Sequence, residues 1–326
     1  MEMQYGFGID LGGTTCKLGL FLSEGTLLEK WEIPTDTSDC GARILPDIAA
    51  AVETKLTERG IEKAAVLGVG IGVPGAVDQT GVVHRCVNLG WGVVNVKNTL
   101  SSLTGLPVHV ANDASIAALG EAWKGAGAGM SGMLLLTLGT GIGGGIVLNG
   151  RLWNGYHGAA GEFGHMLVNP AETELCSCGK RGCLEQYASA TGLVRCMCLQ
   201  LQTDDRPSRL RSLESFTAKD VIDAAKDGDA LALTVAQSSF ELLGVAAANL
   251  CNALNPETVI LGGGVSEAGE ILLDWIRPGF ERAVFAPCRE TRLLLAALGN
   301  DAGICGGMRL LLEAHENQNN HMTNYE

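Results

Sequence analysis

The sequence predicts an α/β protein with two domains. The chain has 326 residues, which is enough for one large or two ordinary domains. Apolar stretches typical of buried strands alternate along it with amphipathic stretches typical of helices. A strand, a glycine-rich turn and a second strand occur together twice, within residues 5–22 and 133–148. Because each copy begins a block of strands and helices, the repetition indicates a duplicated architecture.

The overall composition narrows the possible partners. Apolar residues make up 46% of the chain and charged residues 18%, which supplies a large core and excludes global disorder. The formal net charge is −13 and no basic run interrupts it, so we expect neither nucleic acid nor an anionic membrane as a partner. A bound phosphate would have to be held by backbone amides, a few lysines and metal ions.

The cysteines and the N-terminal residues indicate a reducing compartment. The 11 cysteines are an odd number, in a chain too large to need disulfides for stability. The first residues enter a strand at once and contain no secretory apolar region, so we expect a cytoplasmic protein. The uncharged run between Lys124 and Arg151 is long enough to cross a bilayer, but its glycines and Thr-Gly turns indicate two buried strands around a loop.

The first hairpin, with strands Tyr5–Asp10 and Cys16–Leu22, is a candidate phosphate site. Its turn amides can point at one anion, its threonine hydroxyls can donate to that anion, and the aspartate at the strand end can hold a hydrated magnesium ion. The candidate residues are Asp10, Gly12, Gly13, Thr14, Thr15 and Lys17. Hairpins need glycine in their turns in any case, so this motif alone leaves an ordinary turn equally open. A third strand is predicted at Leu27–Ile33.

Residues 40–91 supply a packing helix, a buried strand and a loop. The helix is predicted at Cys40–Arg59 and has one apolar stripe. The near-continuous apolar run Ala64–Val73 predicts a strand covered on both faces. It leads into a turn containing Gly75, at the strand end where α/β folds place their ligands. In the loop that follows, Asn88 is the best candidate to touch a substrate, and an ordinary turn asparagine is the alternative.

Two polar residues, Asn112 and Asp113, follow the apolar strand Val108–Ala111. The helix predicted at Ala114–Trp123 begins directly after them, so Asp113 could serve only as its N-cap. A carboxylate at the tip of a strand can also face a cleft and accept a proton from an alcohol. Both roles remain open for Asp113 at this point. A short helix is predicted before the strand, at Val96–Thr104.

The second hairpin repeats the first. The strand Met133–Leu138 meets the glycine turn 139–145, and a second strand follows at Ile146–Leu148. Two phosphate-binding turns that face each other across a cleft resemble the actin-like ATPase fold, a ribonuclease H-like architecture, so we expect that fold. A third glycine turn lies between the strand Thr258–Leu261 and the helix Glu267–Phe280, and it suits the adenosine end of a nucleotide. The candidate nucleotide contacts in these two turns are Thr140, Gly141, Gly263 and Gly264.

Three cysteines and a histidine lie close together in the segment 162–185. Cys176, Cys178 and Cys183 share one short loop, and His165 lies upstream. Thiolates and a neutral imidazole are ligands that zinc prefers, and four of them close a tetrahedral shell, so we expect a structural zinc ion. A chance cluster in a cysteine-rich chain is the alternative.

Two carboxylates flank these four residues. Glu162 lies one helical turn before His165, and Glu185 lies two residues after Cys183, so a shared metal would bring both carboxylates into one neighbourhood. Carboxylates are good acceptors for sugar hydroxyls. Since His165 has two ring nitrogens, it can bind zinc through one and a sugar through the other.

The remaining elements follow from apolar periodicity. We expect helices at Gln186–Leu201, Ala218–Lys226, Asp229–Leu254 and Ala302–Glu313, a polar loop at Asp204–Ser212, a strand at Leu293–Ala297 and a frayed polar tail at His315–Glu326. The helix Asp229–Leu254 is apolar beyond one stripe, so it is buried either within its domain or between subunits. For the domains we expect residues 1–112 with 302–326 to form a smaller α/β domain. Residues 113–301 would form the larger one, with Asp113, the sugar-binding residues and the zinc loop.

These features together predict a phosphoryl transferase that acts on a polyhydroxylated substrate. Asp113 would accept the proton of a sugar's primary hydroxyl as that oxygen attacks the γ-phosphate of ATP. Lysines and magnesium would neutralise the charge that develops on the phosphates. The predicted substrate contacts are Gly75, Asn88, Asn112, Asp113, Glu162, His165 and Glu185.

The chain resembles the ROK family of sugar kinases. The run Cys176-x-Cys178-Gly179-x-x-Gly182-Cys183-x-Glu185 after His165 is similar to that family's signature, and Glu162-x-Gly164-His165 is similar to its sugar-binding motif. The resemblance implies the actin-like two-domain fold, ATP with magnesium, phosphorylation of a hexose at its 6-hydroxyl, and a homodimer, with a tetramer as the alternative. Residues 184–192 are most similar to the bacterial members that phosphorylate glucose.

Other functions remain open within and outside this resemblance. Kinases of N-acetylmannosamine, N-acetylglucosamine and other hexoses share most of the site. Sugar-responsive repressors of the family carry a DNA-binding module before the kinase-like body, whereas here the Asp10 turn begins almost at residue one and the charge does not suit DNA. A zinc-bearing adaptor without catalysis would leave Asp113 and the three glycine turns unexplained.

Overall fold

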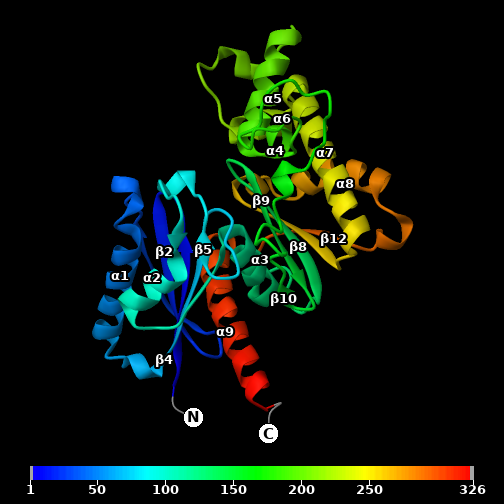
Figure 1. Cartoon of the computed structure of the whole chain (residues 1–326). Helices are drawn as coiled ribbons and strands as arrows, with labels where there is room; N and C mark the ends of the chain where they lie inside the picture. The colour runs from blue at the N-terminus through cyan, green and yellow to red at the C-terminus, as the bar shows by residue number, and fades with distance from the viewer. Residues whose placement is uncertain (1–2, 324–326) are drawn as a thin grey trace. The chain divides into compact units, whose positions relative to one another are not determined.

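The computed structural model of the chain describes the backbone of residues 3–323 and the side chains of residues 3–317. The chain forms two compact units (Figure 1). The first unit contains the described residues up to Gly129, then Gly145–Gly161 and the described residues from Leu298. The second contains Met130–Gly144 and Glu162–Ala297. The predicted domain bounds differ from these units, because they assign residues 113–129, 145–161 and 298–301 to the larger domain.

The first unit is built on a mixed sheet with the strand order β3-β2-β1-β4-β7. Its strands are β1 (Tyr5–Leu11), β2 (Thr15–Leu22), β3 (Leu27–Pro34), β4 (Val66–Val73) and β7 (Val108–Asn112). The first three are antiparallel neighbours, and β4 and β7 run parallel to β1. These strands confirm the predicted ones with small differences at their ends. The predicted loop before Trp91 also contains β5 (Val82–Val83), which pairs with β6 (Val94–Asn95).

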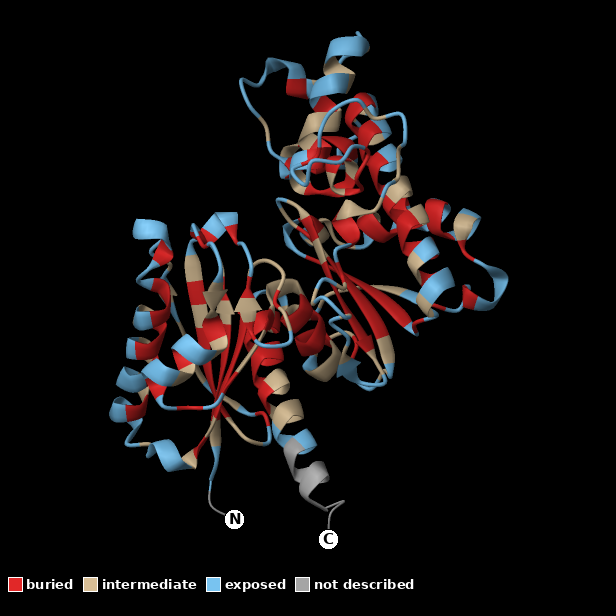
Figure 2. Cartoon of the chain, in the orientation of Figure 1, coloured by how far each residue is buried: buried red, intermediate tan, exposed pale blue. Residues whose placement is uncertain are grey.

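Helices cover both faces of this sheet. The helices α1 (Ile44–Arg59) and α2 (Val96–Thr104) share a buried core with one face, and α9 (Ala302–Thr323) packs on the other. Glycines let α9 approach closely, since a Cβ atom at Gly8 would lie 1.9 Å from the carbonyl oxygen of Ile304. In Figure 2 the central strands of this sheet are buried, and α1 presents exposed residues on its outer side. The predicted helix at 40–59 begins later, because residues 39–41 form a separate 3₁₀ turn.

The helix α3 (Asp113–Lys124) packs beside α9 in the first unit. The two helices meet through glycines, and a Cβ atom at Gly306 would lie 1.6 Å from the carbonyl oxygen of Ile116. This close packing explains why residues 113–129 belong with the first unit. The helix α9 also continues to Thr323, so the predicted frayed tail is wrong up to that residue, and residues 324–326 lie outside the described part. No glycine or proline interrupts residues 308–323.

The second sheet has the strand order β10-β9-β8-β11-β12. Its strands are β8 (Gly132–Leu138), β9 (Ile142–Leu148), β10 (Arg151–Leu152), β11 (Thr258–Gly262) and β12 (Arg292–Leu295). The prediction of one turn over residues 139–145 is wrong, because the turn ends at Gly141 and the next glycines continue in β9. A Cβ atom at Gly145 would lie 2.4 Å from that of Ala118, so close packing on α3 explains a glycine inside this strand.

The helices of the second unit are α4 (Glu185–Ala188), α5 (Ala190–Thr203), α6 (Ala218–Lys226), α7 (Ala230–Leu254) and α8 (Glu270–Ala283). The single helix predicted at 186–201 is two helices, because Ser189 is extended and its side chain accepts a hydrogen bond from the amide of Gly192 as the N-cap of α5. Thr217 and Asp220 form a capping box at the start of α6. The helix predicted from Glu267 begins at Glu270, because a 3₁₀ segment over residues 264–268 precedes it.

Among the described helices, α7 alone is long and apolar enough to cross a membrane, and core helices of soluble proteins pass the same test. It packs against α8, where Phe240 stacks on Trp275 with ring centroids 5.9 Å apart. A Cβ atom at Gly244 would lie 2.1 Å from the carbonyl oxygen of Ile276, so the two helices approach closely. These contacts are those of a core helix.

Candidate functional site

The first glycine turn connects β1 to β2 and is held from the side by the residue after β3. The amide of Gly12 donates to the carbonyl of Thr15 at 3.1 Å, and the amide of Thr35 donates to the carbonyl of Thr14 at 2.9 Å. The hydroxyl of Thr35 donates to the carbonyl of Gly12 at 2.8 Å. The tip of the turn, residues 13–14, is exposed. The turn is therefore fixed in shape and open to an anion.

Asp10 and Lys17 lie directly opposite each other at the base of this turn. Asp10 packs against Gly303 at the start of α9, where a Cβ atom would lie 2.4 Å from Asp10 Cγ. Burial raises the pKa of Asp10, and the charge of Lys17 partly offsets that effect. Lys17 Nζ donates to Asn300 Oδ1 at 3.0 Å. A cation at the turn would therefore stabilise a carboxylate that is otherwise costly to ionise.

Asn112, and not Asp113, is the N-cap of α3. Asn112 Oδ1 accepts a hydrogen bond from the amide of Ser115 at 3.1 Å, and its Nδ2 donates to the carbonyl of Gly75 at 3.1 Å. The capping role that the sequence left open for Asp113 therefore belongs to its neighbour. Asp113 is the first helical residue, and its Oδ1 accepts from the amide of Ala114 at 2.9 Å.

The loop between β4 and α2 lies next to these residues. The pKa of the Cys86 thiol in this loop is raised by burial and, to a smaller extent, by the negative charge of Asp113. Asn88 lies beside the first glycine turn, since a Cβ atom at Gly13 would be 3.8 Å from the carbonyl oxygen of Asn88. The first unit thus brings Gly75 to Asn112 and Asn88 to the first glycine turn.

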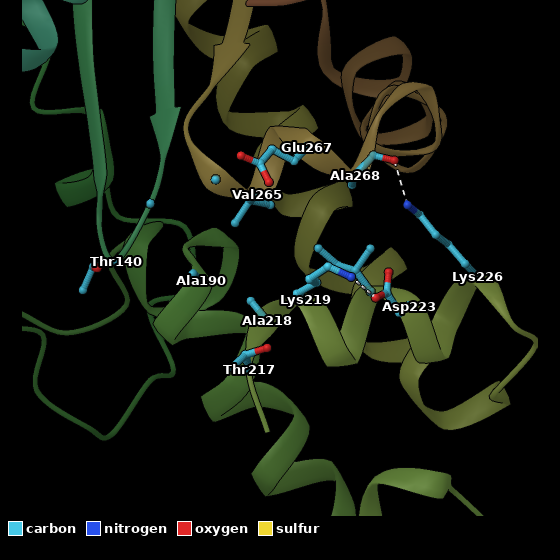
Figure 3. Close-up of a pocket in the computed structure, with 13 residues that line it drawn as sticks. Thr140, Ala190, Thr217, Ala218, Lys219, Asp223, Lys226, Val265, Glu267 and Ala268 are labelled. Carbon is cyan, nitrogen blue, oxygen red and sulfur yellow. Dashed lines mark hydrogen bonds and ion pairs between the residues drawn. The ribbon is translucent and has the colours of Figure 1, made fainter. Parts of the chain in front are cut away.

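The second unit contains a cavity of about 460 Å³ (Figure 3). It lies among the turn after β8, the start of α5, the helix α6 and the 3₁₀ segment after β11. The lining residues are Gly139, Thr140, Ala190, Thr217, Ala218, Lys219, Ile222, Asp223, Lys226, Gly264, Val265, Glu267 and Ala268. Its wall combines apolar side chains with two lysines and two carboxylates, which suits a ligand with a flat apolar part and charged groups.

Two of the predicted nucleotide contacts, Thr140 and Gly264, line this cavity. Gly141 and Gly263 neighbour them in the chain but are not among the lining residues. The α6 side of the wall is fixed by an ion pair between Lys219 and Asp223 and by Lys226 Nζ, which donates to the carbonyl of Ala268 at 2.8 Å (Figure 3). Sequence reasoning missed the α6 residues, because apolar periodicity predicts that helix but not its neighbours in space.

The second glycine turn is held by the segment that leads from α4 into α5. Glu185 Oε2 accepts a hydrogen bond from the amide of Ile142 at 3.0 Å. The amide of Ala190 donates to the carbonyl of Gly139 at 2.8 Å, and Thr191 Oγ1 donates to the carbonyl of Thr140 at 2.6 Å. Glu185, predicted only as a sugar contact, therefore also fixes the end of this turn.

The structure brings together the four predicted metal ligands, His165, Cys176, Cys178 and Cys183. Their ligand atoms all lie within 4.8 Å of one another. Cys176 Sγ is 3.8 Å from His165 Nδ1, and Cys178 Sγ is 3.6 Å from Cys183 Sγ. Ligands about 2.3 Å from a tetrahedral ion are separated by about 3.7 Å, so these distances suit one ion with a closed shell.

Both predicted carboxylates lie beside this cluster. Glu162 Oε2 is 4.0 Å from His165 Nε2, the ring nitrogen that does not face Cys176. Glu185 Oε1 accepts from Ser177 Oγ at 3.1 Å and lies 4.0 Å from Cys176 Sγ. The side chain of Glu162 is 47% exposed, so it is accessible to a ligand. The second unit therefore gathers two carboxylates and an imidazole nitrogen, which can accept or donate hydrogen bonds to sugar hydroxyls.

Comparison with known proteins places this site in context. The model of the ROK family matches residues 6–314. The glucokinase of Halalkalibacterium halodurans is 46% identical over 314 residues, which are 94% of each chain. The crystal structure of a ROK family glucokinase from Streptomyces griseus in complex with glucose and AMPPNP has a TM-score of 0.75 and 35% identity, over 95% of this chain and 99% of that one. A ROK family transcriptional regulator, a homologue of the E. coli MLC protein, has a TM-score of 0.84 and 28% identity, over 95% of this chain and 78% of that one.

Proposed function

The chain belongs to the ROK family, and we propose that it is an ATP-dependent glucokinase, which phosphorylates glucose at the 6-hydroxyl. The observation that carries this proposal is the 46% identity to a glucokinase over 94% of both chains. The similarity to a glucokinase crystallised with glucose and an ATP analogue supports it. The expected actin-like ATPase fold, with its mixed α/β sheets, agrees with that relationship.

The cavity of the second unit is our candidate for the nucleotide site. Its apolar wall would receive the base, and the turn containing Thr140 and Gly141 would lead toward the phosphates. Lys219 and Lys226 would add positive charge, although each already has a partner. We propose that the first glycine turn, with Thr14, Thr15 and Lys17, holds the transferred phosphate through backbone amides and hydroxyls.

Asp113 is our candidate for the general base. It would take the proton of the 6-hydroxyl while that oxygen forms a bond to the γ-phosphorus, and the bond from phosphorus to the β–γ bridging oxygen breaks to release ADP. Asn112 performs the capping task, which supports a separate role for Asp113. The other sugar contacts that we propose are Gly75, Asn88, Asn112, Glu162, His165 and Glu185, which would orient the ring through its remaining hydroxyls.

The residues of the four-ligand cluster fit a zinc ion. The distances between ligand atoms suit a tetrahedral shell, and three thiolates with one imidazole are a donor set that zinc prefers. We propose that His165, Cys176, Cys178 and Cys183 hold a structural zinc ion. His165 would use Nδ1 for the metal and present Nε2 toward Glu162 and the sugar. Magnesium would accompany ATP, and the partly buried carboxylate of Asp10 would hold a water of its shell.

A coupled ADP-release assay tests the proposed reaction. Purified protein with ATP and magnesium would be offered glucose, N-acetylmannosamine, N-acetylglucosamine, allose and fructose, with an assay lacking sugar as the control. We expect the largest kcat/KM with glucose. A larger kcat/KM for an N-acetylhexosamine would identify that sugar, and not glucose, as the preferred substrate. No ADP release with any of the sugars would instead favour a sugar-responsive regulator, the class to which one similar structure belongs.

We further propose a cytoplasmic homodimer, with a tetramer as the alternative. The compartment follows from the ATP requirement and from thiols that must stay reduced to bind zinc. Part of the apolar helix α7 would contribute to a subunit interface. Sedimentation of the purified protein at micromolar concentration tests this proposal, and a single monomeric species would contradict it.

A further inference from the structure

A cluster of paired charged side chains packs against the loop 166–184, which carries the three cysteines of the four-ligand cluster. The proposed reaction gives these charged side chains no role. At its centre is Arg195 of α5, whose side chain is 22% exposed. Its Nε donates to Glu174 Oε2 at 2.6 Å, and its Nη2 donates to Glu172 Oε2 at 2.7 Å. Its Nη1 donates to the carbonyl of Gln186 in α4 at 3.3 Å. One guanidinium on α5 therefore holds both the loop and α4.

Glu172 receives a second connection from α4. The hydroxyl of Tyr187 donates to Glu172 Oε2 at 2.5 Å and accepts from Asn169 Nδ2 at 2.8 Å. The other carboxylate oxygen of Glu172 accepts from the amide of Glu174 at 3.0 Å. The side chain of Glu172 is only 9% exposed. The amide of Glu174, then the Tyr187 hydroxyl and Arg195, lower the pKa of Glu172 to about 2, so the carboxylate is charged at neutral pH.

The charged side chains of this cluster bond to one another and to the backbone, which is the arrangement of a structural network and not of a ligand site. The position of the network in the chain indicates what it holds in place. Residues 169–174 lie between His165 and Cys176, and α4 begins with Glu185. Gln186 adds a further link, because its Oε1 accepts from the amide of Cys183 at 3.1 Å and its Nε2 donates to the carbonyl of Glu174 at 3.1 Å. The network therefore connects two segments to α4, the helix that carries Glu185. One is the segment between His165 and Cys176, and the other is Cys183.

We propose that Arg195, Glu172 and Tyr187 form a brace that positions the sugar-binding residues of the second unit. In this role Arg195 holds the loop between His165 and Cys176 at a fixed distance from α4, and so fixes Glu185 relative to the imidazole. It is a positioning residue, since it acts through the loop. The planar guanidinium suits the task because it binds several oxygens in a rigid geometry, which a lysine ammonium cannot reproduce. This inference rests on the proposed sugar kinase function.

Three variants test the brace by steady-state kinetics: Arg195→Met, Arg195→Lys and Tyr187→Phe. Loss of residues that orient ligands from behind typically costs about 10- to 100-fold in affinity or activity. We expect Arg195→Met to raise the KM for glucose by about that factor, with the KM for ATP changed by less than about threefold. Arg195→Lys keeps the positive charge but lacks the planar group of N–H donors, so its KM for glucose should rise less than that of Arg195→Met. Tyr187→Phe removes one hydroxyl and should give the smallest increase.

A matched control is Arg209→Met, which removes an exposed ion pair with Asp227 in the same unit. We expect it to leave both KM values unchanged. Equal increases in the KM for glucose and for ATP, or an unchanged KM for glucose in a folded Arg195→Met variant, would overturn the brace. If Arg195→Met does not fold, Tyr187→Phe decides by the same criterion.

A second readout does not depend on activity. Hydrogen exchange of residues 166–184 should be faster in the Arg195 and Tyr187 variants than in the Arg209 control, because the loop loses its anchor. Unchanged exchange would overturn the brace even if the wild-type chain phosphorylated none of the sugars. Absence of wild-type kinase activity together with faster loop exchange would reject the proposed function alone and retain the brace.

Discussion

The side chain of Asn112 accepts a hydrogen bond from the backbone amide of Ser115, three residues further along the chain, at 3.1 Å. This bond caps α3 and leaves Asp113, the next residue after Asn112, as the first residue of the helix. A carboxylate in the first turn is also favoured by the helix dipole. Asp113 is thereby held at the end of β7 without being needed as the cap, so its chemical role can be tested separately from folding.

Asp113→Asn should abolish most turnover and leave the fold intact. General-base catalysis is typically worth roughly 100- to 10,000-fold in rate, so we expect kcat to fall by about that factor, with little change in Tm. The matched control is Asn112→Ala, which should lower stability by about 0.5–2 kcal/mol through loss of the cap. More than about a tenth of wild-type turnover in Asp113→Asn would show that Asp113 is not the base.

Glu185→Gln should weaken sugar binding more than nucleotide binding. Loss of a charged acceptor costs roughly 1.5–3 kcal/mol, which corresponds to an increase of about 10- to 150-fold in the KM for glucose. The amide oxygen of glutamine can still accept from Ile142, so the turn beside the cavity should keep its shape and the KM for ATP should change little. Comparable losses for both substrates would contradict this division.

Cys178→Ser should remove most of the bound zinc and lower Tm. We expect one zinc ion per chain in the wild-type protein by elemental analysis, because four ligands close a single shell. Cys198→Ser is the control, since Cys198 is a second exposed cysteine and lies on α5 outside the cluster. Full zinc content and unchanged stability in Cys178→Ser would show that the assignment of ligands is wrong.

Ionisation of the Glu313 side chain should lower the free energy of unfolding as pH rises toward 8. Its Oε1 is buried without a hydrogen-bond partner among the described residues, although Arg309 Nε lies 3.5 Å away. Burial raises the pKa of Glu313 from 4.5 to about 7; Arg309 and Arg151 oppose that rise, and Glu316 adds to it. The folded protein therefore binds more protons than the unfolded chain between these values. Its contribution to stability is fully present below pH 4.5 and is lost as pH rises through about 7.

The variant Glu313→Gln, which cannot ionise, tests this pH dependence. The free energy of unfolding of the variant minus that of the wild type should be larger at pH 8 than at pH 5, by on the order of 2 kcal/mol. Urea unfolding at both pH values measures it. Glu24→Gln is the control, because Glu24 is an exposed glutamate of the same unit and is not among the groups that shift the pKa of Glu313. An equal effect of Glu313→Gln at both pH values would contradict the raised pKa.

Patterns close together in the sequence predicted structure better than relations between distant segments. The spacing of His165 and the three cysteines was enough to identify a compact cluster, because a short loop limits how far its ligands can separate. The role of Asn112 was not accessible in this way, since either polar residue before a helix can cap it. The α6 wall of the cavity and the contact of Glu185 with Ile142 depend on packing across long sequence separations, which periodicity does not encode.

The packing of α9 on β1 also has a consequence for the order of synthesis. A ribosome completes residues 130–297, the span that holds all of the second unit, before it makes α9. Until then the sheet of the first unit lacks the helix that covers Gly8 and Gly70, and that face stays exposed to chaperones and proteases. A released chain that ends at residue 297 should therefore be cleaved within residues 3–129 and protected in the second unit, a pattern that limited proteolysis can detect.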